Sequence, residues 1–312
     1  MIEDDIMVEQ VVDSSRTFTI DVTEIPPPPD VRYAFTVGGY NNLYGILDVV
    51  ERYDKDTNVW VERANLINRR FSFTAFPLNN YGYVAGEFVH MPTERYDNTT
   101  NSWTSRAKVN LSRSGPSSIY TPISAFVAGG YTTRGTVVGA TEQYDDKIDI
   151  WLNRSSMNIP RYLTTGFSIG GYGYIVGGAI QNNEIVDDNE RYDTQSDTWV
   201  TKTKISTNKF NLASFSLNGY GYIAGGKKIS GDYADVECYN PTSDTWSMKS
   251  EMSYIRSCAT GFTLGNYGYI AGGKLGRDSY LSIVEKYDAT TDSWTKIRNM
   301  NTPRTCLESF TL

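Results

Sequence analysis

The strongest constraint on this chain of 312 residues is a sixfold repeat marked by all six of its tryptophans. Successive tryptophans lie 43 to 48 residues apart, and each follows a tyrosine by seven residues and a glutamate by nine. The repeated residues are the tryptophans Trp60, Trp103, Trp151, Trp199, Trp246 and Trp294, the tyrosines Tyr53, Tyr96, Tyr144, Tyr192, Tyr239 and Tyr287, and the glutamates Glu51, Glu94, Glu142, Glu190, Glu237 and Glu285. A period of this length is typical of folds built from stacked or circularly arranged units.

Each unit has the pattern of four short strands. In the unit 256–296 we predict strands over 258–264, 267–272 and 283–287, and a fourth that opens at Trp294. Asn/Gly pairs and Asp/Thr/Ser runs between them are typical hairpin turns. Four strands every ~45–50 residues indicate a propeller blade. We therefore predict an all-β protein, a six-bladed β-propeller of four-stranded antiparallel blades.

A glycine pair precedes the glutamate in most units. The pairs start at Gly38, Gly129, Gly177, Gly225 and Gly272, with Gly86-Glu87 in the second unit. Together, the glycine pair, the Glu-x-Tyr-Asp strand and the tryptophan resemble the kelch repeat, over about nine tenths of the chain. The resemblance implies that the C-terminal strand completes the first blade, since the body begins at a second strand, 33–38, and ends with a lone first strand, 306–312. The predicted boundaries are an arm at 1–30, blade 1 at 31–63 plus 305–312, blade 2 at 70–105, blade 3 at 113–153, blade 4 at 161–201, blade 5 at 209–248 and blade 6 at 256–296.

The charge of the chain is concentrated in its first 30 residues. They hold eight acidic residues and one basic residue, so they carry the whole formal charge of −7 and leave 31–312 neutral. A neutral body offers no broad basic surface, and we predict no nucleic-acid partner. The arm ends in four prolines at 26–29, which favour a stiff spacer. Phe18, Ile20 and Val22 alternate along one strand face, so the arm is either a β-arm that docks on another subunit or a disordered acidic tail.

Histidine and cysteine are too few for most metal sites. The chain has one histidine and three cysteines, Cys238, Cys258 and Cys306, without a CxxC pair. We interpret the cysteines as buried thiols or chance occupants rather than a disulfide framework, and predict no metal and no cofactor. The first 25 residues lack the pattern of a signal peptide, and no stretch approaches ~18 consecutive apolar residues. We therefore predict no membrane insertion and a location in the cytoplasm or in a virion.

A basic residue stands sixteen positions before each glycine pair. The set, called the basic ring below, is Arg70, Arg113, Arg161, Lys209 and Arg256, with Arg304 in the matching place before the last strand. These side chains either form internal ion pairs with the repeated glutamates or line a pocket for an anion or acidic peptide. The kelch resemblance favours the pocket, because similarly placed arginines in some members contact acidic peptide motifs.

The loops between the second and third strands, the b–c loops, are predicted to share a face with the basic ring. They vary between units and are rich in tyrosine, asparagine and glycine, as adaptable binding surfaces are, although ordinary solvated loops remain the alternative. The candidate binding residues are Tyr40, Tyr44, Tyr131, Arg134, Tyr233, Arg277 and Tyr280. The loop of the second unit is five residues shorter and holds the lone His90, which predicts a notch in the rim there.

These patterns predict a non-enzymatic recognition module. The arm anchors it in a larger assembly and the loop-bearing face is displayed to a protein partner; a decoration or receptor-binding protein of a virus particle is one concrete version. The first alternative is a cytoplasmic adaptor that binds acidic peptides through the basic ring. The second is an enzyme acting on a sugar acid, similar to a kelch-type sialic-acid epimerase, for which the ligand is a glycan.

Overall fold

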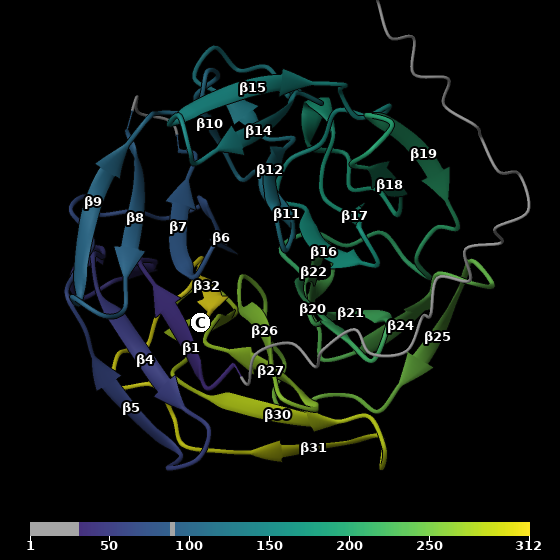
Figure 1. Ribbon diagram of the computed structural model, residues 1–312. Helices are drawn as coiled ribbons and strands as arrows, with labels where there is room; N and C mark the ends of the chain where they lie inside the picture. Colours follow the sequence, from purple (N-terminus) through teal and green to yellow (C-terminus); the bar gives the residue numbers. More distant parts are fainter. Residues whose placement is uncertain (1–30, 88–90) are drawn as a thin grey trace, which may run out of the picture. The chain divides into compact units, whose positions relative to one another are not determined.

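The computed structural model describes residues 31–87 and 91–312, which form six four-stranded antiparallel sheets set around a central axis (Figure 1). The fold is the predicted six-bladed propeller. Phe18, Ile20 and Val22 of the arm lie outside the described residues, as does His90. No helix in the described part of the chain is long and apolar enough to cross a membrane.

Every blade runs from an inner strand a to an outer strand d. Blade 1 contains β32 (Glu308–Thr311), β1 (Tyr33–Val37), β4 (Val50–Asp54) and β5 (Val59–Glu62). Blade 2 contains β6 (Thr74–Leu78), β7 (Tyr81–Ala85), β8 (Thr93–Asp97) and β9 (Ser102–Arg106). Blade 3 contains β11 (Ser117–Thr121), β12 (Ser124–Ala128), β14 (Thr141–Asp145) and β15 (Ile150–Arg154).

The second half of the ring repeats this order. Blade 4 contains β16 (Thr165–Ile169), β17 (Tyr172–Val176), β18 (Asn189–Asp193) and β19 (Thr198–Lys202). Blade 5 contains β20 (Ala213–Leu217), β21 (Tyr220–Ala224), β24 (Val236–Asn240) and β25 (Thr245–Lys249). Blade 6 contains β26 (Thr260–Leu264), β27 (Tyr267–Ala271), β30 (Val284–Asp288) and β31 (Ser293–Lys296). The strands of blade 6 begin and end within two residues of the predicted ranges.

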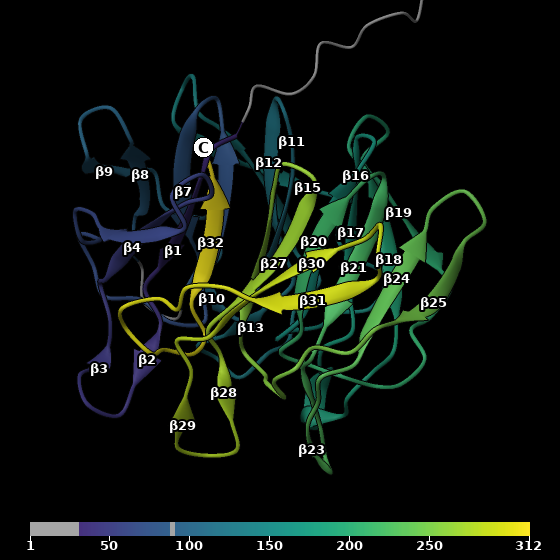
Figure 2. The same ribbon diagram turned by 90° about the horizontal axis from the view of Figure 1, so that it is seen from below.

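Short elements occupy the b–c loops on one face of the ring (Figure 2). They are the hairpins β2 (Tyr40–Asn41) with β3 (Gly45–Ile46), β22 (Lys227–Lys228) with β23 (Gly231–Asp232) and β28 (Lys274–Leu275) with β29 (Ser279–Tyr280), the strand β13 (Tyr131–Thr132) and the 3-10 turn η1 (Gln181–Asn183). β13 pairs with β10 (Arg113–Ser114), which lies in the connection from blade 2 to blade 3. The b–c loops therefore differ in structure as well as in sequence.

The C-terminal strand closes the ring. β32 pairs antiparallel with β1, with Ala34 opposite Thr311 and Phe35 opposite Phe310. Blade 1 is thereby assembled from both ends of the described chain, as the resemblance implied. Pairing of β32 satisfies the backbone edge of β1 that would otherwise be open.

The repeated aromatics pack at the boundaries between blades. Each tyrosine packs against its tryptophan across the c–d hairpin in a tilted arrangement, with ring centroids 4.9–5.0 Å apart in all six blades. The indole nitrogen then donates to the backbone of the preceding blade, as from Trp199 to the carbonyl of Ser155 at 2.8 Å. The repeated tyrosines and tryptophans therefore have a structural role and link neighbouring blades.

Glycines make room where neighbouring blades meet. A Cβ atom on Gly221 of blade 5 would lie 2.2 Å from the ring of Phe167 in blade 4. Gly129, the first of its pair, has a φ of +70°, and a Cβ there would lie 2.5 Å from the carbonyl oxygen of Arg161. Glycine is therefore favoured at these positions for two reasons, close approach of a neighbour and left-handed backbone.

Candidate functional site

The face that carries the b–c loops also carries the connections between blades. Backbone hydrogen bonds join the two sets, for example from Gly39 to the carbonyl of Arg70 at 2.8 Å and from Tyr40 to the carbonyl of Thr305 at 2.9 Å. The basic ring and the loops therefore share one face, as predicted. Access to solvent is what separates them.

The side chains of the basic ring are buried inside the blades. Relative exposure is 0–1% for all six residues. Each forms an ion pair with the strand-c glutamate of its own blade: Arg70 with Glu94 at 3.0 Å, Arg113 with Glu142, Arg161 with Glu190 at 3.0 Å, Lys209 with Glu237 at 3.0 Å, Arg256 with Glu285 at 2.6 Å and Arg304 with Glu51 at 2.8 Å. Of the two interpretations that the sequence left open, the geometry therefore favours internal ion pairs over a ring that presents its charges to a ligand.

Further hydrogen bonds complete these ion pairs. Arg161 also donates to the carbonyls of Gly177 at 3.1 Å and Asp188 at 2.7 Å, while Glu190 accepts from the backbone of Asn158 at 2.7 Å and Ile159 at 3.2 Å. Desolvation lowers the pKa of the Arg161 guanidinium, but an arginine stays charged at neutral pH. Each pair thus fastens the entry of strand a, the end of strand b and the incoming connection to strand c.

The candidate tyrosines fall into separate sectors. Tyr40 and Tyr280 come together from blades 1 and 6, with ring centroids 5.9 Å apart. Tyr131 instead lies beside Tyr162, at 5.4 Å, between blades 3 and 4. Tyr233 of blade 5 packs against Lys228, whose nitrogen lies 4.1 Å from the ring centroid. Tyr44, Arg134 and Arg277 are exposed on three different loops.

Three consecutive blades carry neighbouring hairpins, which we call the hairpin wall: residues 227–232 of blade 5, 274–280 of blade 6 and 40–46 of blade 1 (Figure 2). The amide of Gly276 donates to Asp232 at 2.6 Å and so joins the first two hairpins. Tyr280 donates to Asn42 at 2.8 Å, and Asn42 donates to Asp278 at 3.1 Å, which joins the second and third. These bonds between hairpins restrain the wall as one surface.

Each hairpin of the wall exposes apolar side chains at its tip or beside it. Ile229 is 96% exposed, Leu43 76%, Tyr44 64% and Leu275 46%. Of these, only Tyr44 was identified from the sequence, which drew attention to tyrosines, asparagines and arginines. A signal was present, because an isoleucine or leucine at the tip of a polar loop needs a reason to face solvent.

Blade 2 differs from the others at the matching position. Glu87 replaces the second glycine, yet its backbone keeps a φ of +144° and its side chain is 4% exposed. Burial raises the pKa of this carboxyl to about 7. The notch predicted here stays a prediction, because residues 88–90 lie outside the described part of the chain.

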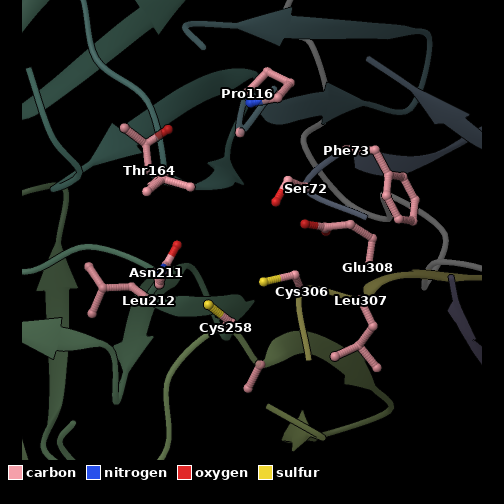
Figure 3. Close-up of a pocket in the computed structure, with 13 residues that line it drawn as sticks. Ser72, Phe73, Pro116, Thr164, Asn211, Leu212, Cys258, Cys306, Leu307 and Glu308 are labelled. Carbon is pink, nitrogen blue, oxygen red and sulfur yellow. The ribbon is translucent and has the colours of Figure 1, made fainter. Parts of the chain in front are cut away.

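A small cavity of about 60 Å³ lies on the central axis (Figure 3). Its wall includes Ser72, Cys258, Cys306 and Glu308. Burial raises the pKa of Glu308 to about 8, so this carboxyl is largely protonated at neutral pH. No group of three or more His, Cys, Asp or Glu residues in the ranges 31–87 and 91–312 is placed to hold a metal ion.

Sequence comparison agrees with this architecture. The family model described as the Kelch motif matches residues 33–67 and 255–301, which lie in blades 1 and 6. A search of curated proteins gives no match. The fold is a six-bladed β-propeller, and its blades 1 and 6 match the Kelch motif. Propellers of this family typically serve as protein-interaction modules.

Proposed function

We propose that this protein is a non-enzymatic recognition module that binds a protein partner through the hairpin wall. The observation that carries the proposal is the cluster of exposed apolar tips, Leu43, Tyr44, Ile229 and Leu275, on hairpins that hydrogen bonds join across three blades. Single exposed apolar residues are ordinary, whereas several on one restrained surface favour a binding site. A rigid scaffold with variable loops suits recognition.

The charge of the wall suggests the chemistry of the partner. Four basic residues, Lys227, Lys228, Lys274 and Arg277, stand against Asp232 and Asp278. Both aspartates already accept hydrogen bonds from the adjacent hairpin. A partner segment with apolar and acidic side chains therefore fits the wall better than a basic one. This moves the acidic-peptide hypothesis from the buried basic ring to the exposed hairpins.

The second part of the proposal concerns residues 1–30, and it rests on sequence. The acidic arm anchors the propeller in a larger assembly, and the wall remains displayed. Both a decoration protein of a virus particle and a cytoplasmic adaptor would bind a partner through the wall, but only the decoration protein needs the arm as an anchor. The sugar-acid enzyme gains no support, because the arginines that suggested a carboxylate pocket are buried against glutamates.

The test is affinity capture from the native source with three forms of the protein. The wall variant carries Leu43→Asp, Ile229→Asp and Leu275→Asp. We expect it to retain at most about one tenth of the partner that the unchanged chain captures, because charges replace the apolar contacts at the centre of the surface. A form beginning at Asp30 tests the arm separately. It should no longer capture the components of the larger assembly but should still capture the partner that binds the hairpin wall.

A matched control carries Ile123→Asp and Ile148→Asp. These isoleucines are 82% and 64% exposed, and they lie on turns of the opposite face, between β11 and β12 and between β14 and β15. The control should capture as much partner as the unchanged chain. Equal capture by the wall variant and the control would contradict the proposal.

A further inference from the structure

Cys258 and Cys306 occupy the same position in successive repeats. They lie 48 residues apart, one repeat length, and each stands two residues before its strand a, β26 and β32. Both have left-handed backbone, with φ of +52° and +50°. The amide of Cys306 donates to the carbonyl of Cys258 at 2.8 Å. This backbone hydrogen bond holds the two residues side by side, and a disulfide requires Cα atoms about 4.4–6.8 Å apart.

Both cysteines line the axial cavity. Figure 3 shows both side chains pointing into it, near Ser72 and Glu308. The third cysteine, Cys238, is also a free thiol but lies within β24 at the boundary with blade 6, away from this cavity.

We propose that Cys258 and Cys306 are a redox pair that hydroperoxides convert to a disulfide across the boundary between blades 6 and 1. The structure contains both as unlinked thiols, which is the reduced state. The free thiols agree with the sequence-based interpretation that the cysteines form no disulfide framework, and the proposed oxidation of this pair goes beyond that interpretation. Residues far apart in the chain became neighbours because equivalent positions of all blades converge on the axis.

Hydrogen peroxide is small enough for a cavity of about 60 Å³. The Cys306 thiolate attacks one peroxide oxygen, the O–O bond breaks, and a sulfenic acid and hydroxide form; the hydroxide takes up the proton lost by the thiol. Cys258, deprotonated as it reacts, then attacks the sulfenic sulfur, and the S–O bond breaks to give the disulfide and a second water. Two thiols and one peroxide thus yield one disulfide and two waters.

The environment assigns different roles to the two thiols. The hydrogen bond from Cys258 lowers the pKa of Cys306 to about 7, while the same contact and burial raise the pKa of Cys258. Lys274 and the hydroxyls of Ser72 and Thr305 also favour the Cys306 thiolate. Cys306 is therefore the thiol that reacts first with peroxide, and Cys258 resolves the sulfenic acid.

The disulfide would act on ring closure. Cys306 leads directly into β32, the strand that completes blade 1, and Cys258 leads into β26 of blade 6. A covalent bond between these positions would keep the closing strand at the ring when its hydrogen bonds to β1 open. The bond closes a loop of about 48 residues, which is long enough to stabilise the folded state appreciably.

The experiment treats the reduced full-length protein with one equivalent of hydrogen peroxide. We expect loss of two thiols per chain, an intramolecular Cys258–Cys306 peptide in non-reducing mass spectrometry, and a rise of about 5 °C or more in the unfolding midpoint that dithiothreitol reverses. Cys238→Ser should behave like the unchanged chain. Cys258→Ser should accumulate a sulfenic acid at Cys306, detected with a dimedone probe, and show no such rise.

Several outcomes would overturn the proposal. These are retention of both thiols, oxidation confined to Cys238, or a linked peptide that also forms in Cys258→Ser. The proposal is independent of partner binding, since the thiol count and the midpoint need no partner.

Discussion

At the scale of single residues, Glu87 occupies a position where the other blades have glycine. The other five blades have glycine there: Gly39, Gly130, Gly178, Gly226 and Gly273. Glu87 keeps their left-handed backbone, which is costly for a residue with a Cβ atom. One of its carboxylate oxygens, Oε2, is buried without a hydrogen-bond partner. Blade 2 therefore contains a locally destabilising residue.

The substitution Glu87→Gln should stabilise the protein in a pH-dependent way. Burial raises the pKa of Glu87 from its usual 4.5 to about 7, so the folded state holds a proton that the unfolded state has released between these values. The unchanged chain should lose about 2–3 kcal/mol from this group as pH rises from 4.5 to 7. Glutamine does not titrate. Urea unfolding at pH 4.5 and pH 8 should show a gain at pH 8 that is absent or much smaller at pH 4.5.

The control for this prediction is Glu62→Gln, the same change at an exposed residue of β5. It should alter stability by less than about 0.5 kcal/mol at both pH values. A gain from Glu87→Gln that is equal at both pH values would show that backbone strain or shape, rather than the buried charge, is the cause.

At the scale of strands and connections, the buried ion pair of each blade links its strands b and c to the connection from the preceding blade. In blade 4, Arg161 bonds to Glu190 on β18 and to carbonyls at the end of β17, while Glu190 holds the connection from β15. The sequence showed the sixfold recurrence of both partners and left pairing as one of two interpretations. It could not decide between them, because burial of a charged side chain depends on how the strands pack.

Arg161→Met should lower the free energy of unfolding by about 3–5 kcal/mol, since it leaves Glu190 buried without its charge partner. The double variant Arg161→Met with Glu190→Gln should lose less than the sum of the single losses, because neither charge is then left alone. Chemical denaturation of the four proteins gives the coupling. The control Arg134→Met, at an exposed arginine of a b–c loop, should lower the free energy of unfolding by less than about 0.5 kcal/mol. Additive losses at positions 161 and 190 would show that the two side chains are not energetically coupled.

At the scale of the whole molecule, stability depends on closure by β32. Phe310 of this strand is 2% exposed and stacks on Phe35 of β1 with centroids 5.0 Å apart. It also lies over Gly82 of blade 2, where a Cβ would come within 2.1 Å of its ring. One side chain of the last strand therefore supports two blades.

Phe310→Ala should cost about 3–5 kcal/mol, as the loss of a large buried ring usually does. Removal of residues 308–312 should cost more and expose the edge of β1, so this form should self-associate in size-exclusion chromatography. Thr311→Ala on the same strand serves as the control, and it should elute like the unchanged chain and be nearly as stable. A truncated chain with an unchanged midpoint would show that closure does not depend on β32.

The sequence by itself determined the number of blades and the four strands in each, and its resemblance to the kelch repeat implied closure by the last strand. Glycines, tyrosines and tryptophans at fixed offsets report local turns and packing that every unit repeats, so one chain contains six copies of the same evidence. Only the tertiary structure decided that the basic ring is buried, that three hairpins with exposed apolar residues form one wall and that Cys258 lies beside Cys306. These features depend on which side chains converge between blades and at the axis, and no single repeat contains that information.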